Sequence, residues 1–168
     1  MQQPSRLHEE MNSNIDEWSG PTGSEGSIER LCSISLRACF LMNPLISAIY
    51  QQLLDSLNQS NSISGVKKDN SAITIADGLV QKLLTDVLLS EVAFRDIVGE
   101  EGDDDNDVEQ SWFEVQGLSV PHILRPLVET TKDDILKLAQ EYLSHNGDTN
   151  DIYQHITVFI DPIDGTRE

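Results

Sequence analysis

One stretch decides the fold expected of this chain: Ile156-Thr157-Val158-Phe159-Ile160-Asp161-Pro162-Ile163-Asp164-Gly165-Thr166-Arg167-Glu168. Its first five residues are apolar or β-branched, which predicts a buried strand. Two carboxylates follow in a tight turn, where Pro162 fixes φ and Gly165 permits a close approach of the backbone. Such a turn suits Mg²⁺, which takes oxygen ligands and leaves positions for a substrate phosphate. An Asp-Gly pair by itself is more often a solvated turn, so the choice between a solvated turn and a metal site depends on the other motifs of the chain.

The length and the charge of the chain limit its class and its partners. Its 168 residues suffice for one domain with a core, and 38% hydrophobic and 24% charged residues describe a globular protein. The formal net charge of −18 argues against nucleic acid and against an anionic membrane as partners, because both would repel the protein. A small phosphorylated substrate stays compatible with this charge if metal ions invert the local field.

The cysteines and the N-terminal residues bear on the compartment. Cys32 and Cys39 match no zinc or redox spacing and share one helix face, so we expect buried, reduced thiols. We expect no apolar stretch of membrane-spanning length, and residues 1–20 lack the pattern of a signal peptide. A cytoplasmic protein is the default expectation, and the oligomeric state stays open.

Hydrophobic periodicity predicts an α/β architecture that follows a polar tail. Residues 1–27 are rich in Ser, Gly, Glu and Asn and are expected to be disordered or loosely attached. The predicted helices are Ile28–Leu57, Thr74–Leu89 and Asp133–Ser144, and the predicted strands are Val92–Val98 and Gln154–Ile160. Ser27, Thr74 and Thr131 are the expected N-caps, and Pro44 either kinks the first helix or splits it. We expect layers in which helices cover one face of a sheet.

Two further motifs precede the acidic turn. The first is Lys67-Lys68-Asp69-Asn70-Ser71-Ala72-Ile73-Thr74-Ile75-Ala76-Asp77, which leads into the second helix. Its spacing alone favours Asp77 as an acid in a first helical turn, where the capping box and the helix dipole stabilise it. The second motif is Val98-Gly99-Glu100-Glu101, which places two acids directly after a strand and a glycine. Two acids in that position also suit a cation.

An acidic segment at 102–109 allows two interpretations. The first is a solvated acidic loop. The second is a calcium loop, because the first, third, fifth and twelfth EF-hand positions hold Asp103, Asp105, Asp107 and Glu114. Val108 stands where that loop requires glycine for its sharp turn, which favours the solvated loop.

The three motifs, in this order, resemble the signature of the inositol monophosphatase superfamily of metal-dependent, lithium-sensitive phosphatases. They span Lys67 to Thr166, the catalytic N-terminal half of a family member. The string Thr-Ile-Ala-Asp-Gly-Leu-Val-Gln and the long interval from Glu101 to Asp161 look most like the 3'(2'),5'-bisphosphate nucleotidase branch. That branch removes a phosphate from 3'-phosphoadenosine 5'-phosphate. An inositol (poly)phosphate phosphatase and a non-catalytic acidic cation-binding module are the alternatives.

The resemblance implies a two-metal Mg²⁺ site and a role for each motif. By similarity, two ions would be held by Glu100, Asp161, Asp164 and the carbonyl of Ile163. A third, weaker ion would lie near Asp77 and Glu101. Thr166, hydrogen-bonded to Asp77, would orient or deprotonate the attacking water. The N–H groups of Gly165 and Thr166 would face the phosphate, and Lys67 or Lys68 would neutralise charge from a loop over the site.

The resemblance also implies the layered α-β-α-β-α sugar-phosphatase fold. Residues 28–168 would be its N-terminal α+β half, because the Trp-Asp-x-Ala motif of the family's second half does not occur in this sequence. That motif supplies a further metal ligand. We therefore expect the C-terminal half to be absent from this chain, and catalysis to belong to the full-length protein.

Overall fold

The computed structural model describes residues 18–24, 26–59, 66–90, 92–100, 112–115, 117–143 and 152–162, with only the backbone described for 53–54, 56–59 and 66–73. Two long helices come first, and a third follows a small hairpin. The helical elements are α2 (Ile28–Gln59), α3 (Val66–Lys82), the π-helical η1 (Leu83–Leu88), the 3₁₀ turn η2 (His122–Leu124), α4 (Arg125–Tyr142) and the 3₁₀ turn η3 (Tyr153–His155). The strands are β1 (Asp96–Gly99), β2 (Glu114–Val115), β3 (Leu118–Ser119) and β4 (Thr157–Ile160).

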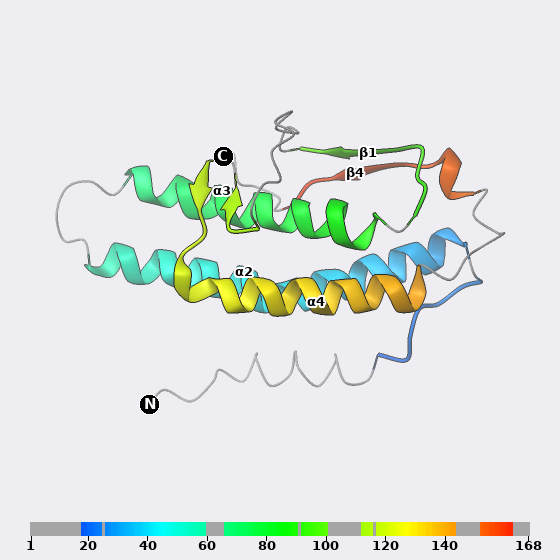
Figure 1. Cartoon of the computed structure of the whole chain (residues 1–168), viewed down its shortest axis with the longest axis horizontal. Helices are drawn as coiled ribbons and strands as arrows, with labels where there is room; N and C mark the ends of the chain where they lie inside the picture. The colour runs from blue at the N-terminus through cyan, green and yellow to red at the C-terminus, as the bar shows by residue number, and fades with distance from the viewer. Residues whose placement is uncertain are drawn as a thin grey trace.

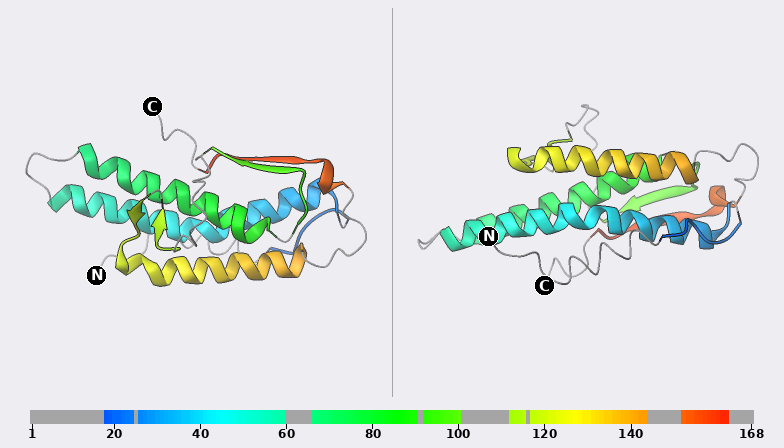
Figure 2. Two further views of the ribbon diagram at one scale, coloured as in Figure 1. Left: turned by 45° about the horizontal axis from the view of Figure 1, so that its top comes forward. Right: turned by 90° about the horizontal axis from the view of Figure 1, so that it is seen from below.

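The helices form one packed group, and the strands β1 and β4 lie on one side of it (Figures 1 and 2). α2 packs against both α3 and α4, and η1 continues α3 along α4. A mixed α/β class is therefore observed, and most of the described chain is helical. The small antiparallel hairpin of β2 and β3 lies against α3.

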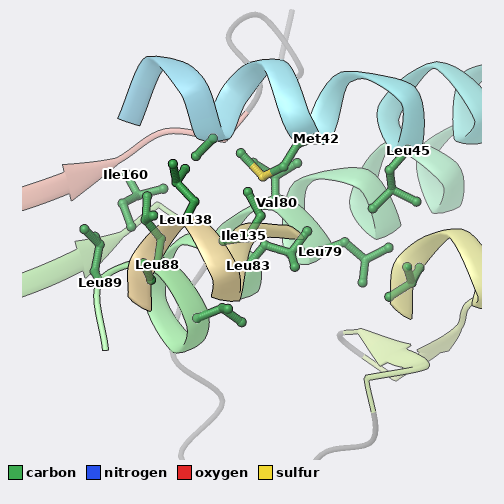
Figure 3. Close-up of a cluster of buried hydrophobic side chains, with 14 of the residues drawn as sticks. Met42, Leu45, Leu79, Val80, Leu83, Leu88, Leu89, Ile135, Leu138 and Ile160 are labelled. Atoms are coloured by element: carbon green, nitrogen blue, oxygen red, sulfur yellow. The ribbon is translucent and has the colours of Figure 1, made fainter. Parts of the chain in front are cut away.

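The core fills the space between the three helices, and β4 closes one side of it (Figure 3). α2 contributes apolar residues at helical spacing, because every third or fourth residue points to the same side. The residues from α2 are Ile34, Ala38, Met42, Leu45 and Ile49. The opposing side chains labelled in Figure 3 include Leu79, Leu83, Ile135, Leu138 and Ile160. Each of these residues is buried, so the helices have a continuous core of their own.

α2 runs without a break through Pro44, so the alternative of two separate helices is wrong. Pro44 is exposed, which places its ring on the side of the helix that faces away from the core. Ile28–Gln52 is also long and apolar enough to cross a membrane by length and composition. The expectation that no stretch reaches that length is therefore wrong. A mostly buried core helix of a soluble protein and a signal sequence near the N-terminus pass the same test, and 28% of the qualifying 18-residue window is buried here.

Three expected N-caps were tested, and one is correct. Ser27 accepts a hydrogen bond on its Oγ from the N–H of Arg30 at 3.1 Å, which confirms it as the cap of α2. Thr74 is not a cap, because α3 begins at Val66 and Thr74 lies in its interior. Thr131 is buried inside α4, which begins instead at Arg125 with a proline in its first turn.

Glycine lets the hairpin approach α3 closely. A Cβ on Gly78 would lie 2.0 Å from the Cγ1 of Val115, so no larger residue fits between α3 and β2 without movement. Gly117 has a φ of 72° and forms the turn between β2 and β3. Each strand of this hairpin has only two residues, so no alternation of apolar and polar residues was long enough to predict it.

β1 and β4 are parallel neighbours, and both are shorter than predicted. Their register pairs Ile97 with Val158 and Gly99 with Ile160. These four residues face the helices, while the alternate pair Val98 and Phe159 is exposed. The predicted strand at Val92–Val98 forms only from Asp96, and η3 occupies the start of the predicted strand at Gln154–Ile160.

The residues before α2 pack on the helices. The ring of Trp18 meets Tyr142 edge-on, with centroids 5.2 Å apart, and the guanidinium of Arg37 lies 5.2 Å from the Trp18 ring. The hydroxyl of Tyr153 donates a hydrogen bond to the carbonyl of Ser27 at 3.0 Å. Trp18 is thereby tied to α4, and Ser27 to η3.

Cys32 and Cys39 are free thiols, as expected, but they are exposed. The prediction of buried cysteines is therefore wrong. Helical spacing showed that the two share a face of α2, yet it could not show that described elements leave this face largely uncovered. The same side of α2 carries Leu36 and Phe40, which are 59% and 37% exposed.

Candidate functional site

The parallel pairing of β1 and β4 brings two of the predicted metal ligands to one edge of the sheet. Glu100 follows β1 directly and Asp161 follows β4 directly. The N–H of Glu100 donates to the carbonyl of Ile160 at 2.9 Å, which continues the ladder past the last paired residues. Both acidic side chains are exposed. Adjacent parallel strands lie about 4.8 Å apart, so the two residues begin neighbouring turns.

A glutamine on α3 lies against this edge. A Cβ on Gly99 would come within 2.4 Å of three terminal side-chain atoms of Gln81, so the two residues are in direct contact. Gln81 is itself buried. The sequence analysis did not identify Gln81 as a site residue, although Gln81 ends the string Thr-Ile-Ala-Asp-Gly-Leu-Val-Gln that resembles the nucleotidase branch. Its contact with Gly99 fixes how α3 is aligned with the ends of the strands.

Asp77 lies one helical turn before Gln81, on the same side of α3. It is 4% exposed and is one of few buried polar residues in the described chain. Its Oδ1 is shielded from solvent and accepts no hydrogen bond from the described residues, although the residue does take part in another polar interaction. Asp77 is therefore an interior acid that faces the sheet side of α3, rather than the solvated acid of a first helical turn.

The other predicted site residues divide into two groups. Lys67 and Lys68 lie in the first turn of α3, so they belong to a helix and not to the loop that the resemblance implies. The remaining predicted residues lie outside the described residues: Glu101, Ile163, Asp164, Gly165 and Thr166. The acidic segment 102–109, and with it most of the EF-hand alternative, lies outside them too.

The described carboxylates alone do not form a closed cation site. Within the described ranges, no group of three or more His, Cys, Asp or Glu side chains is close enough to hold a metal ion. Glu100 and Asp161 follow neighbouring strands, whereas Asp77 is buried on α3. Their oxygen donors are of the kind that Mg²⁺ prefers. A complete site at this edge would need ligands from outside the described residues.

An apolar groove runs beside the end of β4. It has a volume of about 190 Å³ and lies between α2, η1 and the last residues of the strand. Its lining includes Leu31, Cys39 and Leu88, together with one acidic residue, Asp161. Desolvation against the groove raises the pKa of the Cys39 thiol, even though the residue as a whole is exposed. Sequence periodicity could not find this groove, because it depends on how β4 lies across α2.

Comparisons with known proteins leave the family of this chain open. No family model matches it, and no curated protein or solved structure matches it significantly. The resemblance to the inositol monophosphatase superfamily therefore depends on the three sequence motifs alone.

Proposed function

We propose that this chain is part of a Mg²⁺-dependent, lithium-sensitive phosphomonoesterase that acts on 3'-phosphoadenosine 5'-phosphate or a related bisphosphate nucleotide. The observation that carries the proposal is the parallel pairing of β1 with β4, which makes Glu100 and Asp161 neighbours. These residues come from two motifs that are 61 positions apart in the chain (161 − 100 = 61). The third motif supplies Asp77 from the helix that packs behind the same edge.

The donors at this edge fit Mg²⁺. Glu100 and Asp161 would hold the ions, together with Asp164 and the carbonyl of Ile163, and Glu101 would complete a weaker site. When bound, the ions would lower the pKa of a coordinated water and neutralise the phosphate oxygens. The open faces of Glu100 and Asp161 agree with a site that a substrate must enter.

The buried carboxylate of Asp77 would act through a neighbouring hydroxyl. An acid shielded from water holds a fixed position, so it could accept a hydrogen bond from the hydroxyl of Thr166 and orient it. Thr166 would then position the attacking water and take up its proton while its own hydroxyl proton passes to the Asp77 carboxylate. Gly165 and Thr166 would offer backbone N–H groups to the phosphate, and Lys67 or Lys68 would contribute positive charge.

The finer fold assignment belongs to the same proposal. The helices and the parallel pair would form the N-terminal α+β half of a layered sugar-phosphatase fold. The exposed outer face of β1 and β4 supports this, because parallel sheets are normally covered on both faces. A nucleotide substrate is preferred over an inositol phosphate because of the motif Thr-Ile-Ala-Asp-Gly-Leu-Val-Gln and the long interval before Asp161.

The test is phosphate release by the full-length protein, with 3'-phosphoadenosine 5'-phosphate compared against inositol 1-phosphate and inositol 1,4-bisphosphate. We expect release to require Mg²⁺, to be inhibited by Li⁺ and to be fastest with the nucleotide. Glu100→Gln should remove the activity, whereas Glu129→Gln, an exposed change on α4, should not. Saturable Mg²⁺ binding without turnover of any of the three substrates would favour the non-catalytic cation-binding module instead.

A further inference from the structure

A cluster of cations and aromatic rings lies at the start of the hairpin, and the proposed catalysis does not use it. The Nζ atoms of Lys82 and Lys132 lie 5.2 Å and 4.6 Å from the centroid of the Trp112 ring. The guanidinium carbon of Arg125 lies 4.9 Å from the centroid of the Phe113 ring. These five residues, the basic-aromatic cluster, come from α3, α4 and the residues that precede β2.

Rigid elements hold the cluster together. Arg125 and Lys132 are seven positions apart on α4, so they lie on the same side of the helix, about 10 Å apart along its axis. The adjacent rings of Phe113 and Trp112 lie along this side, one beside each cation. The carbonyl of Phe113 accepts a hydrogen bond from the N–H of Val120 at 2.8 Å, which ties the aromatic pair to the hairpin.

The positive charge of the cluster is unusual in this protein. The chain has 11 basic residues against 29 acidic ones, yet three cations gather on two neighbouring rings. Asp86 approaches Lys82 only at 3.9 Å, and the hydroxyl of Thr85 donates to the same carboxylate. Such a long, partly exposed pair is weak, and Lys82 also takes part in a further interaction.

Arg125 and Lys132 form no ion pair with the residues that the structure describes. The Nε of Arg125 is shielded from solvent, and no residue in the described part of the chain accepts its hydrogen bond. A buried donor without an acceptor is costly, and native proteins usually supply the acceptor from protein, water or a ligand. The ammonium of Lys132 lies instead over the Trp112 ring.

We propose that the basic-aromatic cluster is a binding site for the phosphoryl group of a small anionic ligand, separate from the proposed metal site. A guanidinium binds phosphate oxygens in a fixed fork, and lysine ammonium groups add point charges. The indole of Trp112 would form the wall against which a nucleobase stacks. A large polyanion is disfavoured by the net charge of −18, whereas a small anion needs only the local field.

Fluorescence of Trp112 can report the binding directly. The sequence has two tryptophans, so Trp18→Phe in the 168-residue chain leaves Trp112 as the single indole. This protein is titrated in EDTA with inorganic phosphate, adenosine 5'-monophosphate, adenosine and sodium chloride at matched ionic strength. EDTA removes any contribution of a divalent metal site, so the outcome is independent of whether the protein is a phosphatase.

We expect a saturable fluorescence change with adenosine 5'-monophosphate and with phosphate, and none with chloride. The monophosphate should bind more tightly if the indole stacks on its base, and equal affinity would identify the free phosphate as the ligand. Adenosine binding as tightly as its monophosphate would overturn the proposal, because the phosphoryl group would then contribute nothing. A chloride response equal to that of phosphate would overturn it too.

Matched variants assign the site. Lys132→Gln and Arg125→Gln should each weaken binding about tenfold, since each removes one charge-assisted contact. Lys137→Gln removes a lysine from the same helix that is 73% exposed and pairs with Asp134, and it should leave binding unchanged. Lys132→Arg keeps the positive charge, so it should retain binding. The comparison of Lys132→Arg with Lys132→Gln tests the site independently of Arg125→Gln, should that variant unfold. Unchanged affinity in Lys132→Gln would exclude this site.

Discussion

The helical group and the β1–β4 pair differ in how completely their apolar residues are buried. Leu79, Leu83 and Ile135 are fully buried between helices that cover one another. The strands have one covered face, and on the other the cross-strand neighbours Val98 and Phe159 are 38% and 76% exposed. Two strands with one covered face contribute little independent stability. The proposed chemistry nevertheless lies at the ends of these strands.

This difference separates the residues that stabilise the fold from those of the proposed chemistry. The helical core determines whether the chain folds, and the ends of β1 and β4 determine which side chains meet. Gln81 belongs to the buried surface of α3 and also contacts the end of β1 at Gly99. Substitutions in the helical core should therefore change the free energy of unfolding, whereas substitutions at the strand ends should change phosphate release.

The largest effect on stability is expected from the centre of the helical core. Leu83 is fully buried in η1, and Leu83→Ala would leave a cavity between helices that pack against one another. We expect a loss of about 2–5 kcal/mol in the free energy of unfolding. Chemical denaturation measured by far-UV circular dichroism checks this value. A loss below about 1 kcal/mol would mean that the site relaxes to fill the cavity.

Asp161→Asn should act on the chemistry and spare the fold. The residue follows β4 and is exposed, so we expect a change of less than about 0.5 kcal/mol in the free energy of unfolding. In the full-length protein, Mg²⁺-dependent phosphate release should fall by about 100-fold or more, because a metal ligand is lost. Asp134→Asn on α4 is the matched control. Near-normal turnover in Asp161→Asn would contradict the proposed metal site.

Gly99→Ala tests the point where the two regions touch. The added Cβ would meet the terminal atoms of Gln81, so either that side chain or the end of β1 must move. We expect a loss of about 1–2 kcal/mol, as in other overpacked sites. The loss should shrink when Gln81→Ala removes the obstacle, and a double-mutant cycle measures the coupling. Additive effects would show that the contact does not align the strand with α3.

Tyr153→Phe removes one tie between η3 and the start of α2. Loss of the hydrogen bond to the Ser27 carbonyl should cost about 0.5–1.5 kcal/mol at pH 7. Desolvation raises the pKa of Tyr153 above its ordinary value near 10, so the folded state holds this proton more tightly than the unfolded state. Its contribution is complete below pH 10 and falls as pH rises through the folded pKa. Stability measured from pH 9 to 11 should therefore decline less steeply in Tyr153→Phe, and equal slopes would contradict this.

The smallest effect is expected on the outer face of the strands. Phe159→Ser removes a ring that is 76% exposed, so the free energy of unfolding should change by less than about 0.5 kcal/mol. Thermal unfolding of the 168-residue chain checks this. A larger loss would show that the outer face is covered in solution, which would remove the contrast between the two regions.

Features that depend on local sequence could be predicted, whereas contacts between distant segments could not. The apolar spacing of α2 and the N-cap at Ser27 were both predicted, because they depend on local periodicity and on one hydrogen bond. The starts of α3 and α4 were missed, since Thr74 and Thr131 have the side chains of caps but lie inside longer helices. The pairing of β1 with β4 decides which motifs lie next to each other, and no local sequence pattern predicts this pairing.

The sequence by itself determined the order of the motifs, the helical periodicity and the acidic character of the chain. Each of these depends on residue identity and short-range spacing. The tertiary structure decided the rest: Glu100 and Asp161 became neighbours through a parallel ladder, and Asp77 became an interior acid through the packing of α3. It also gathered Lys82, Arg125 and Lys132 on two aromatic rings. Contacts between residues far apart in sequence arise from the burial of shared surfaces, which spacing along the chain does not encode.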